Sequence, residues 1–281
     1  MHLYQDSMNI KGTLFDLTTP KVMGILNATD DSFYDGGKFV HKDGALEHAA
    51  HMLEQGTDII DVGGASSRPG ATAVPKSLEQ DRVLPIIEAI SKAFPQAMMS
   101  IDTNCAETAA LSIKAGAHII NDISAGDDDP DMLETVSLLK VPYIAMHKQG
   151  TPKTMQNNPQ YTNVVSHIAK YFLQKLEEFK RHSILDVVFD PGFGFGKSVA
   201  HNYALLKNLH TLRVLVNAPV LVGVSRKSMI NKVLQVRPED ALNGTTVLHA
   251  WALQNGANIL RVHDVLEAKQ AVLLFNTYKN A

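Results

Sequence analysis

Residues 187–198 read VVFDPGFGFGKS, a short apolar run that ends in an acid and continues into a turn with glycine at every second position. A nucleotide phosphate loop would place a glycine five residues before Gly196, but the chain has Pro191 there, which offers no backbone N–H. A dinucleotide-binding fingerprint would need its third glycine at Lys197. We interpret the stretch as a buried strand with Asp190 at its tip and a close glycine turn, and predict no role for the Lys-Ser pair.

Seven other short runs rich in β-branched residues alternate with amphipathic segments along the chain. Their apolar residues are continuous rather than alternating, which indicates burial on both faces and therefore a parallel sheet covered by helices. The seven intervals between Asn27 and Arg261 average about 33 residues, the repeat expected of a (β/α)8 TIM barrel. A doubly wound sheet is the alternative, because alternation does not prove closure. The predicted strands are 21–26, 58–64, 97–103, 118–124, 142–147, 186–192, 219–225 and 258–264, and the predicted helices are 43–55, 77–93, 104–115, 130–139, 163–181, 200–212 and 239–255.

The composition is typical of a globular protein with a substantial core: 281 residues, 45% hydrophobic and 20% charged. We predict one domain over residues 1–281, with residues 1–20 forming a β-hairpin extension at the N-terminal end of the barrel. The net charge of −3 gives no basic footprint for nucleic acid. The single cysteine, Cys105, excludes an internal disulfide. No run reaches the roughly 18 apolar residues that cross a bilayer, and the start lacks a signal peptide's apolar region, so a cytoplasmic protein is expected.

Polar side chains stand at or just beyond the C-terminal end of every predicted strand. In a barrel these ends face one mouth, where the active site forms. Any one of them could instead cap a helix or shape a turn. Eight strand ends of this kind together predict a polar site at the mouth. The residues are Asn27, Asp61, Asp102, Asn121 with Asp122, His147, Asp190, Ser225, and Arg261 with His263.

The ordered motifs of the chain resemble those of the dihydropteroate synthases. They are MGILNATDDSFYDGG (23–37), GGASSRPGA (63–71), SIDT (100–103), IINDISAG (119–126), MHKQGTPKTMQ (146–156), DPGFGFGK (190–197), GVSRKS (223–228) and RVHDV (261–265). The resemblance runs from Met23 to about Leu274. It implies a TIM barrel, usually a homodimer, that joins 6-hydroxymethyl-7,8-dihydropterin pyrophosphate to p-aminobenzoate and releases pyrophosphate with the support of Mg²⁺.

A pterin presents a flat edge of adjacent donors and acceptors, so a deep site needs a carboxylate, an amide and a cation as partners. Asp190, Asn121 and Lys227 are residues of these types at strand ends. The resemblance makes these three and Asp102 the pterin contacts. It also places Asp102 to stabilise the positive charge that develops on the ring as the C–O bond breaks.

Pyrophosphate needs dispersed positive charge, which suits Arg261 and His263, alternate residues that leave the last strand on the same side. Asn27 offers an amide oxygen to a Mg²⁺ that keeps several waters and bridges the phosphates. The resemblance adds Ser67 and Arg68 to the pyrophosphate contacts. It implies that the catalytic residues are Asp102, Lys227, Arg261 and His263.

Two loops, 28–38 and 64–75, are rich in Gly, Asp and Ser, a composition of segments that close over a reaction and exclude water. By resemblance, Phe33 and Pro69 wall the p-aminobenzoate pocket. Lys227 also borders that pocket, and Ser228, at a helix start, receives the benzoate carboxylate.

The chain departs from the commonest family residues at a few positions. Asp30 stands where the family usually has Pro, Ala65 where it has Glu, and Ser67 where it has Thr, and Lys148 and Asn104 also differ. Most of these positions lie in the two loops. The departures therefore bear on loop movement and inhibitor response more than on the reaction.

Three alternatives stay open from the residues alone. A corrinoid-dependent pterin-binding methyltransferase shares the barrel but has no need of the SSRPG and SRKS segments. A Schiff-base aldolase would use a lysine at the mouth, but in an apolar pocket, whereas Lys227 stands between Arg226 and Ser228. A barrel that binds without catalysis would not need competent residues at every pterin and pyrophosphate position.

Overall fold

The computed structural model describes residues 6–28, 38–65, 74–151, 154–155 and 159–281. At its centre eight parallel strands form one sheet. The strands are β3 (Lys21–Asn27), β4 (Ile59–Gly63), β5 (Met99–Asp102), β6 (Ile119–Asp122), β7 (Tyr143–Met146), β8 (Val187–Asp190), β9 (Leu221–Val222) and β10 (Ile259–Val262).

The sheet closes into a barrel. Its strand order is β8-β7-β6-β5-β4-β3-β10-β9, and the two outer strands meet through a parallel bridge between Phe189 and Val220. The Phe189 N–H also donates to the Pro219 carbonyl at 2.9 Å. This junction confirms the predicted (β/α)8 barrel and excludes the doubly wound sheet, in which the outer strands would stay apart.

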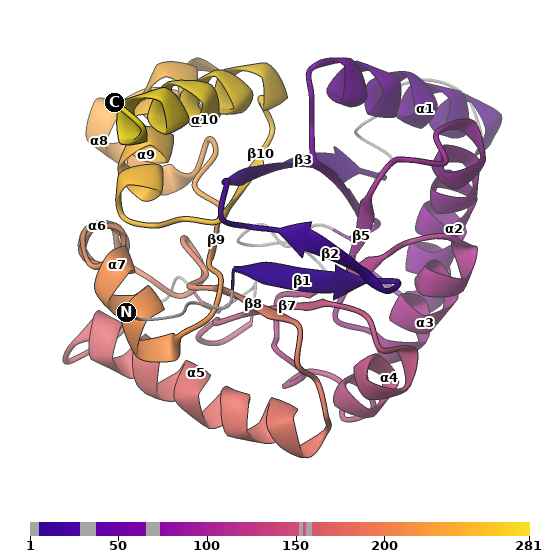
Figure 1. Cartoon of the computed structure of the whole chain (residues 1–281), viewed down its shortest axis with the longest axis horizontal. Helices are drawn as coiled ribbons and strands as arrows, with labels where there is room; N and C mark the ends of the chain where they lie inside the picture. The colour runs from indigo at the N-terminus through magenta and orange to yellow at the C-terminus, as the bar shows by residue number, and fades with distance from the viewer. Residues whose placement is uncertain (1–5, 29–37, 66–73, 152–153, 156–158) are drawn as a thin grey trace.

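Helices surround the barrel on its outer side (Figure 1). The predicted helix over 200–212 is in fact two helices that meet at Asn208, whose side chain donates to the Ala204 carbonyl and ends the first helix. The prediction also omitted the C-terminal helix. Among the described residues, no helix is long and apolar enough to cross a membrane. The helices are α1 (Lys38–Glu54), α2 (Lys76–Ala93), α3 (Ala106–Ala115), α4 (Met132–Leu139), α5 (Val164–Arg181), α6 (Val199–Lys207), α7 (Leu209–Val216), α8 (Ser228–Leu234), α9 (Leu242–Gln254) and α10 (Val265–Lys279).

Helix α5 illustrates how the sequence builds this outer layer. The Asn163 side chain caps its start by accepting the Ser166 N–H at 3.0 Å. Ile168, Phe172 and Phe179 are buried on one face at helical spacing. The Phe172 ring lies 4.4 Å from the ring of Phe189 on β8. Each aromatic side chain buried in this way stabilises the fold by about 1.5–3 kcal/mol.

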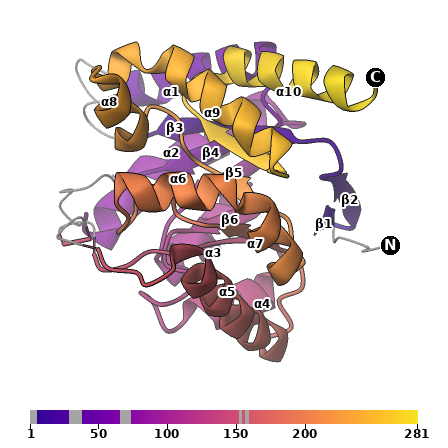
Figure 2. The same ribbon diagram turned by 90° about the vertical axis from the view of Figure 1, so that its left-hand side faces the viewer.

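The predicted N-terminal hairpin is confirmed as β1 (Ser7–Ile10) and β2 (Thr13–Asp16). Lys11 and Gly12 at its tip have φ of 51° and 85°, the two left-handed residues of a type I′ turn. The hairpin lies across the end of the barrel at which the strands begin (Figures 1 and 2). Its apolar side chains close that end, so the site has to form at the other. The residues of this apolar layer are Met8, Ile10, Leu17, Met23, Ile59, Ile119, Ile144, Val188, Leu221 and Ile259.

Candidate active site

A cavity opens at the C-terminal ends of the strands and holds about 290 Å³ of space free of protein atoms. The structure brings all four predicted pterin residues into this one cavity, together with Arg261. The lining residues are Asp102, Asn121, Ile123, Met146, Asp190, Phe195, Gly223, Lys227 and Arg261.

Arg261 lies between two carboxylates on one wall of the cavity. Its Nε donates to Asp61 Oδ2 and its Nη2 to Asp102 Oδ2, both at 2.6 Å. Burial works to lower the pKa of Arg261, but the two carboxylates outweigh burial and raise it. The guanidinium therefore stays charged and compensates the acids on both sides of it.

Asp102 is the carboxyl of this cluster that titrates near neutrality. Burial raises its pKa to about 7, Arg261 opposes the rise, and the neighbouring Asp61 carboxylate adds to it. One guanidinium faces two acids here, so it offsets only part of the cost of a buried second negative charge, and Asp102 can hold a proton. Asp102 can thus be neutral or ionised within the physiological pH range.

Asp61 organises the site from beneath. It is fully buried and accepts from Ser100 Oγ at 2.5 Å and from Asn121 Nδ2 at 3.1 Å, besides Arg261. Because the Asn121 amide nitrogen donates to Asp61, the amide oxygen is the atom left to face the cavity. Asn121 therefore offers an acceptor to a ligand N–H.

Asp190 and Lys227 are two further polar groups of the lining. Asp190 Oδ1 accepts the Gly192 N–H at 2.8 Å, and Lys227 Nζ donates to the Phe193 carbonyl at 2.6 Å. Burial lowers the pKa of Lys227 to about 8, against the pull of Asp190. Burial likewise raises the pKa of Asp190, against Lys227. The lysine ammonium also lies 4.9 Å from the centre of the Phe195 ring, which presents a flat apolar face to the cavity.

Other predicted site residues lie at the same end of the barrel but do not line this cavity. Asn27 is the half-buried last residue of β3, and Ser228 is the first residue of α8, as predicted for a carboxylate receiver at a helix start. His263 follows β10, and its Nδ1 lies 3.0 Å from Ser225 Oγ. The predicted loop contacts Phe33, Ser67, Arg68 and Pro69, with the variant position Asp30, lie outside the described residues.

The predicted convergence is wrong for Asp122 and His147. Asp122 directly follows Asn121, so the alternation of a strand turns it to the outer face, where it accepts from Tyr143 Oη at 2.6 Å. His147 directly follows the cavity residue Met146 and is buried on the outer side for the same reason. The prediction ignored side-chain alternation within each strand end.

Several members of the site were not predicted from the sequence. Met146, Ile123, Gly223 and Phe195 line the cavity without having been proposed. Met146 stands two residues beyond the inward-facing Ile144, so alternation would have found it. Phe195 lies in an irregular turn, where no periodicity could have placed it.

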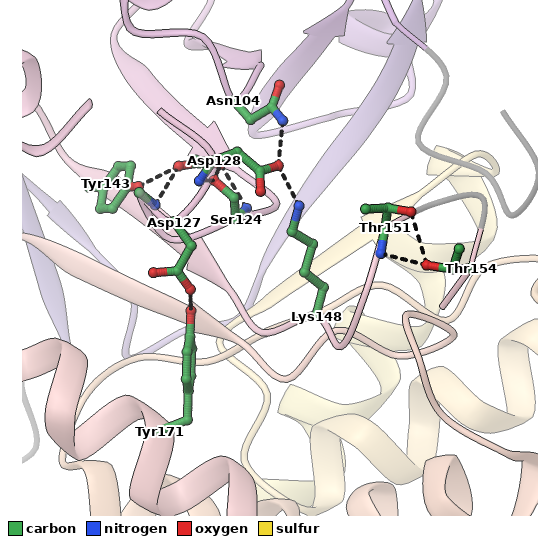
Figure 3. Close-up of polar contacts among 11 residues, drawn as sticks. Asn104, Ser124, Asp127, Asp128, Tyr143, Lys148, Thr151, Thr154 and Tyr171 are labelled. Atoms are coloured by element: carbon green, nitrogen blue, oxygen red, sulfur yellow. Dashed lines mark hydrogen bonds and ion pairs between the residues drawn. The ribbon is translucent and has the colours of Figure 1, made fainter. Parts of the chain in front are cut away.

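A polar bridge connects the loops that follow β5, β6 and β7 (Figure 3). Asp128 accepts from Asn104 Nδ2 at 2.7 Å and forms an ion pair with Lys148. Asn104 and Lys148 each stand two residues beyond a cavity residue, Asp102 and Met146. Two of the positions at which the chain departs from the commonest family residues are therefore joined through one carboxylate at the mouth of the barrel.

Fold and site together define a TIM barrel whose mouth gathers carboxylate, amide, ammonium and guanidinium groups around one cavity. Residues 23–263 match the family model described as "Pterin binding enzyme". The chain is 44% identical to the dihydropteroate synthase of Escherichia coli (strain K12) over 264 residues, which covers 93% of each chain. The chain belongs to the pterin-binding enzymes and, within them, to the dihydropteroate synthases, which are transferases.

Solved structures agree with this assignment. The chain is similar to a Yersinia pestis dihydropteroate synthase in a sulfonamide drug complex, with a TM-score of 0.92 and 42% identity over 98% of this chain and 100% of that one. It is also similar to the Xanthomonas albilineans enzyme in complex with 7,8-dihydropteroate, with a TM-score of 0.88 and 34% identity over 98% of this chain and 99% of that one. These relatives favour the synthase over the corrinoid-dependent methyltransferase.

Proposed function

We propose that this chain condenses 6-hydroxymethyl-7,8-dihydropterin pyrophosphate with p-aminobenzoate to give 7,8-dihydropteroate and pyrophosphate. The observation that carries the proposal is the single cavity in which Asp102, Asn121, Asp190, Lys227 and Arg261 meet. These groups supply the acceptors, donors and charge that a pterin edge requires, at a mouth to which two substrates have access.

The pterin binds by hydrogen bonds to groups that are already oriented. Asp190 accepts from the 2-amino group and the adjacent ring N–H. The Gly192 N–H donates to one oxygen of this carboxylate and so fixes its orientation before the pterin binds. Asn121 accepts a further ring N–H through the amide oxygen that Asp61 leaves free. Lys227 donates to the ring oxygen or nitrogen beside it. Groups that are held in place before binding add affinity, because little side-chain conformational entropy is lost when the ligand binds.

The reaction is an exchange of a C–O for a C–N bond. The bond between the pterin methylene carbon and the ester oxygen breaks, and its electron pair leaves on pyrophosphate. Positive charge develops on the methylene and spreads into the ring, where ionised Asp102 stabilises it. The amine lone pair of p-aminobenzoate then forms the C–N bond, and the nitrogen passes a proton to water.

Pyrophosphate departs toward the cationic side of the mouth, for which we propose Arg261, His263, Ser67 and Arg68. The proposal includes Mg²⁺, which when bound neutralises charge on the leaving group. Among the described residues no three His, Cys, Asp or Glu side chains gather to hold a metal. This fits Mg²⁺, which takes one or two protein oxygens and fills its shell with phosphates and water. Asn27 at the end of β3 would supply the protein oxygen.

We further propose that loops 28–38 and 64–75 close over the reaction and complete the p-aminobenzoate pocket with Phe33, Pro69, Lys227 and Ser228. If the pocket exists only in the closed form, its apparent affinity depends on the fraction of closed protein. Pyrophosphate with Mg²⁺ should then tighten p-aminobenzoate binding to the pterin-bound enzyme. Calorimetric titration with and without pyrophosphate measures this, and equal dissociation constants would mean a preformed pocket.

Assembly as a homodimer in the cytoplasm is also part of the proposal. The exposed apolar side chains of the C-terminal helices support a dimer, because large apolar side chains in one region mark an interface. They are Val233 and Leu234 on α8, Val247 and Trp251 on α9, and Leu266, Leu273, Leu274 and Tyr278 on α10.

Direct assay tests the proposed reaction. The purified chain, pterin pyrophosphate, Mg²⁺ and p-aminobenzoate should yield dihydropteroate by chromatography and an equal amount of pyrophosphate by a coupled assay. Omission of p-aminobenzoate should suppress both products. Release of pyrophosphate without dihydropteroate would identify a hydrolase. If no product formed at all, the chain would be a binding protein without catalytic activity.

A further inference from the structure

Lys197, which ends the glycine-rich stretch, is buried in the fold and not solvated. Its side chain is 2% exposed, although lysine is a residue that usually keeps its ammonium in water. The expectation that the Lys-Ser pair has no role is therefore wrong for both residues. Ser198 caps α6 by accepting the His201 N–H at 3.1 Å, and Lys197 makes the contacts described next.

The Lys197 amine joins two segments that are far apart in the sequence. It donates to the Phe195 carbonyl at 2.9 Å within its own turn, and it reaches His147 at the end of β7, where Nδ1 lies at 3.0 Å and the carbonyl oxygen at 3.3 Å. None of these partners is a carboxylate. Burial lowers the pKa of Lys197 to about 7, against the pull of Asp190.

The contacts fix the glycine turn against His147. The His147 N–H also donates to the Asp190 carbonyl at 3.0 Å, so β7 and β8 are joined at the start of the turn as well as at its end. Gly192 has φ of 71°, and a Cβ there would collide with the His147 carbonyl, the same group that Lys197 binds. A Cβ on Gly192 would also lie 3.3 Å from Lys197 Nζ, so the turn, the His147 carbonyl and the amine are closely packed at this point.

This turn positions three parts of the candidate active site. The Gly192 N–H holds the Asp190 carboxylate, and the Phe193 carbonyl holds Lys227 Nζ. The Phe195 ring lines the cavity, and its carbonyl is the one bound by Lys197. A shift of the turn would therefore misplace the carboxylate, the ammonium and the ring together.

We propose that Lys197 is a positioning residue of the pterin site: it joins the glycine turn to the end of β7 and so orients Asp190, Lys227 and Phe195 toward the pterin. The inference rests on the proposed function for the identity of the ligand. Lys197 itself does not line the cavity and acts through the residues that do.

The test replaces Lys197→Met, which keeps the length and apolar stem but removes the donor. Binding of 6-hydroxymethylpterin, a pterin without a leaving group, should weaken by about 10-fold, the loss that roughly one intramolecular hydrogen bond amounts to, because the turn that holds the three pterin contacts would lose its link to His147. The KM for pterin pyrophosphate should rise by a similar factor and by more than the KM for p-aminobenzoate, because Lys227 is the only one of the three oriented groups that is assigned to the second pocket. The matched control is Lys207→Met, an exposed lysine on the neighbouring helix α6, which should change neither constant.

A lysine that only stabilises the fold would give a different pattern. The Lys197→Met variant would then lose active protein, with a lower kcat but both KM values and the pterin dissociation constant unchanged, and the proposal would be overturned. Lys197→Gln, which keeps an N–H donor in the same direction, should bind pterin with intermediate affinity, and it carries the test if the Met variant does not fold. Wild-type protein that makes no dihydropteroate would refute the proposed function, while the comparison of pterin affinities would still decide the role of Lys197.

Discussion

At the scale of single residues, charge balance around Arg261 governs the site. Asp61 and Asp102 share one guanidinium, and Asp61 also orients Asn121. The sequence predicted that Asp61 lies at the mouth but predicted no role for it. A carboxylate that acts by orienting its neighbours cannot be distinguished in the sequence from any other acid at a strand end. Its burial and three hydrogen-bond partners separate it from a turn residue only once the barrel is closed.

Asp190→Asn should weaken pterin binding by about 2–3 kcal/mol, the usual strength of hydrogen bonds to a charged group. The amide offers one acceptor where the carboxylate has two, and the Gly192 N–H already occupies one oxygen. Calorimetry with 6-hydroxymethylpterin measures the loss. Asp186→Asn, at the opposite end of the same strand, is the control and should bind pterin normally. Unchanged affinity in Asp190→Asn would remove Asp190 from the pterin contacts.

The pH dependence of the reaction should follow Asp102. Its raised pKa of about 7 means that it is neutral below this pH and ionised above it, and only the ionised form stabilises a cation. The kcat/KM for pterin pyrophosphate should therefore rise as pH increases through 7. Asp61→Asn removes a carboxylate that raises this pKa, so the rise should move to lower pH. A rise that persists unchanged in Asp102→Asn would assign it to another group.

At the scale of elements, the loops after neighbouring strands are connected to one another and not only to the barrel. The Asn104–Asp128–Lys148 bridge joins three of them, and the Lys197 contacts join the ends of β7 and β8 (Figure 3). The repeat length in the sequence predicted the strands and most helices well. It could not show these lateral contacts, since each partner belongs to a different repeat.

The Asp128–Lys148 ion pair should be measurable by a double-mutant cycle. Lys148 is largely buried, with 11% of its side chain exposed, and Asp128 is at 34%, so the pair is more shielded than a surface pair. We expect a coupling free energy of about 1 kcal/mol from urea unfolding of Asp128→Ala, Lys148→Met and the double variant. The exposed pair Lys76–Glu107 provides the control cycle and should couple more weakly. Equal coupling in both cycles would show that burial adds nothing here.

At the scale of the whole molecule, the apolar residues of α8, α9 and α10 break the pattern of a polar outer surface. Trp251 is half exposed on α9, although the other helices of the described chain bury most of their large apolar side chains against the barrel. Burial of these residues in a second copy would remove apolar area from water at roughly 25 cal/mol per Å².

The dimer should therefore be sensitive to charge on this face. Trp251→Glu should shift the protein toward monomer in sedimentation velocity runs, because association would bury an unpaired carboxylate. Leu138→Glu is the matched control: Leu138 on α4 is 74% exposed, and its replacement should leave the assembly intact. A wild-type chain that sediments as a monomer at micromolar concentration would contradict the proposed dimer.

The sequence by itself determined the barrel and the chemical types at its mouth. Doubly buried strands at a regular repeat allow few folds other than a TIM barrel, and parallel strands place their C-terminal ends together whatever the details of packing. Asp102, Asn121, Asp190 and Lys227 could thus be predicted to share a site, and they share one cavity. The hairpin was also predictable, because a Lys-Gly turn between two short strands is a local feature.

Only the tertiary structure decided which polar groups face the cavity and what holds them. Asp122 and Asn121 are neighbouring polar residues of similar size, and the alternation of the closed strand sends one outward and the other inward. Lys197 looked incidental because its partners on β7 lie fifty residues away. Hydrogen bonds between distant segments depend on the distance between atoms in the folded chain, and sequence separation carries no information about that distance.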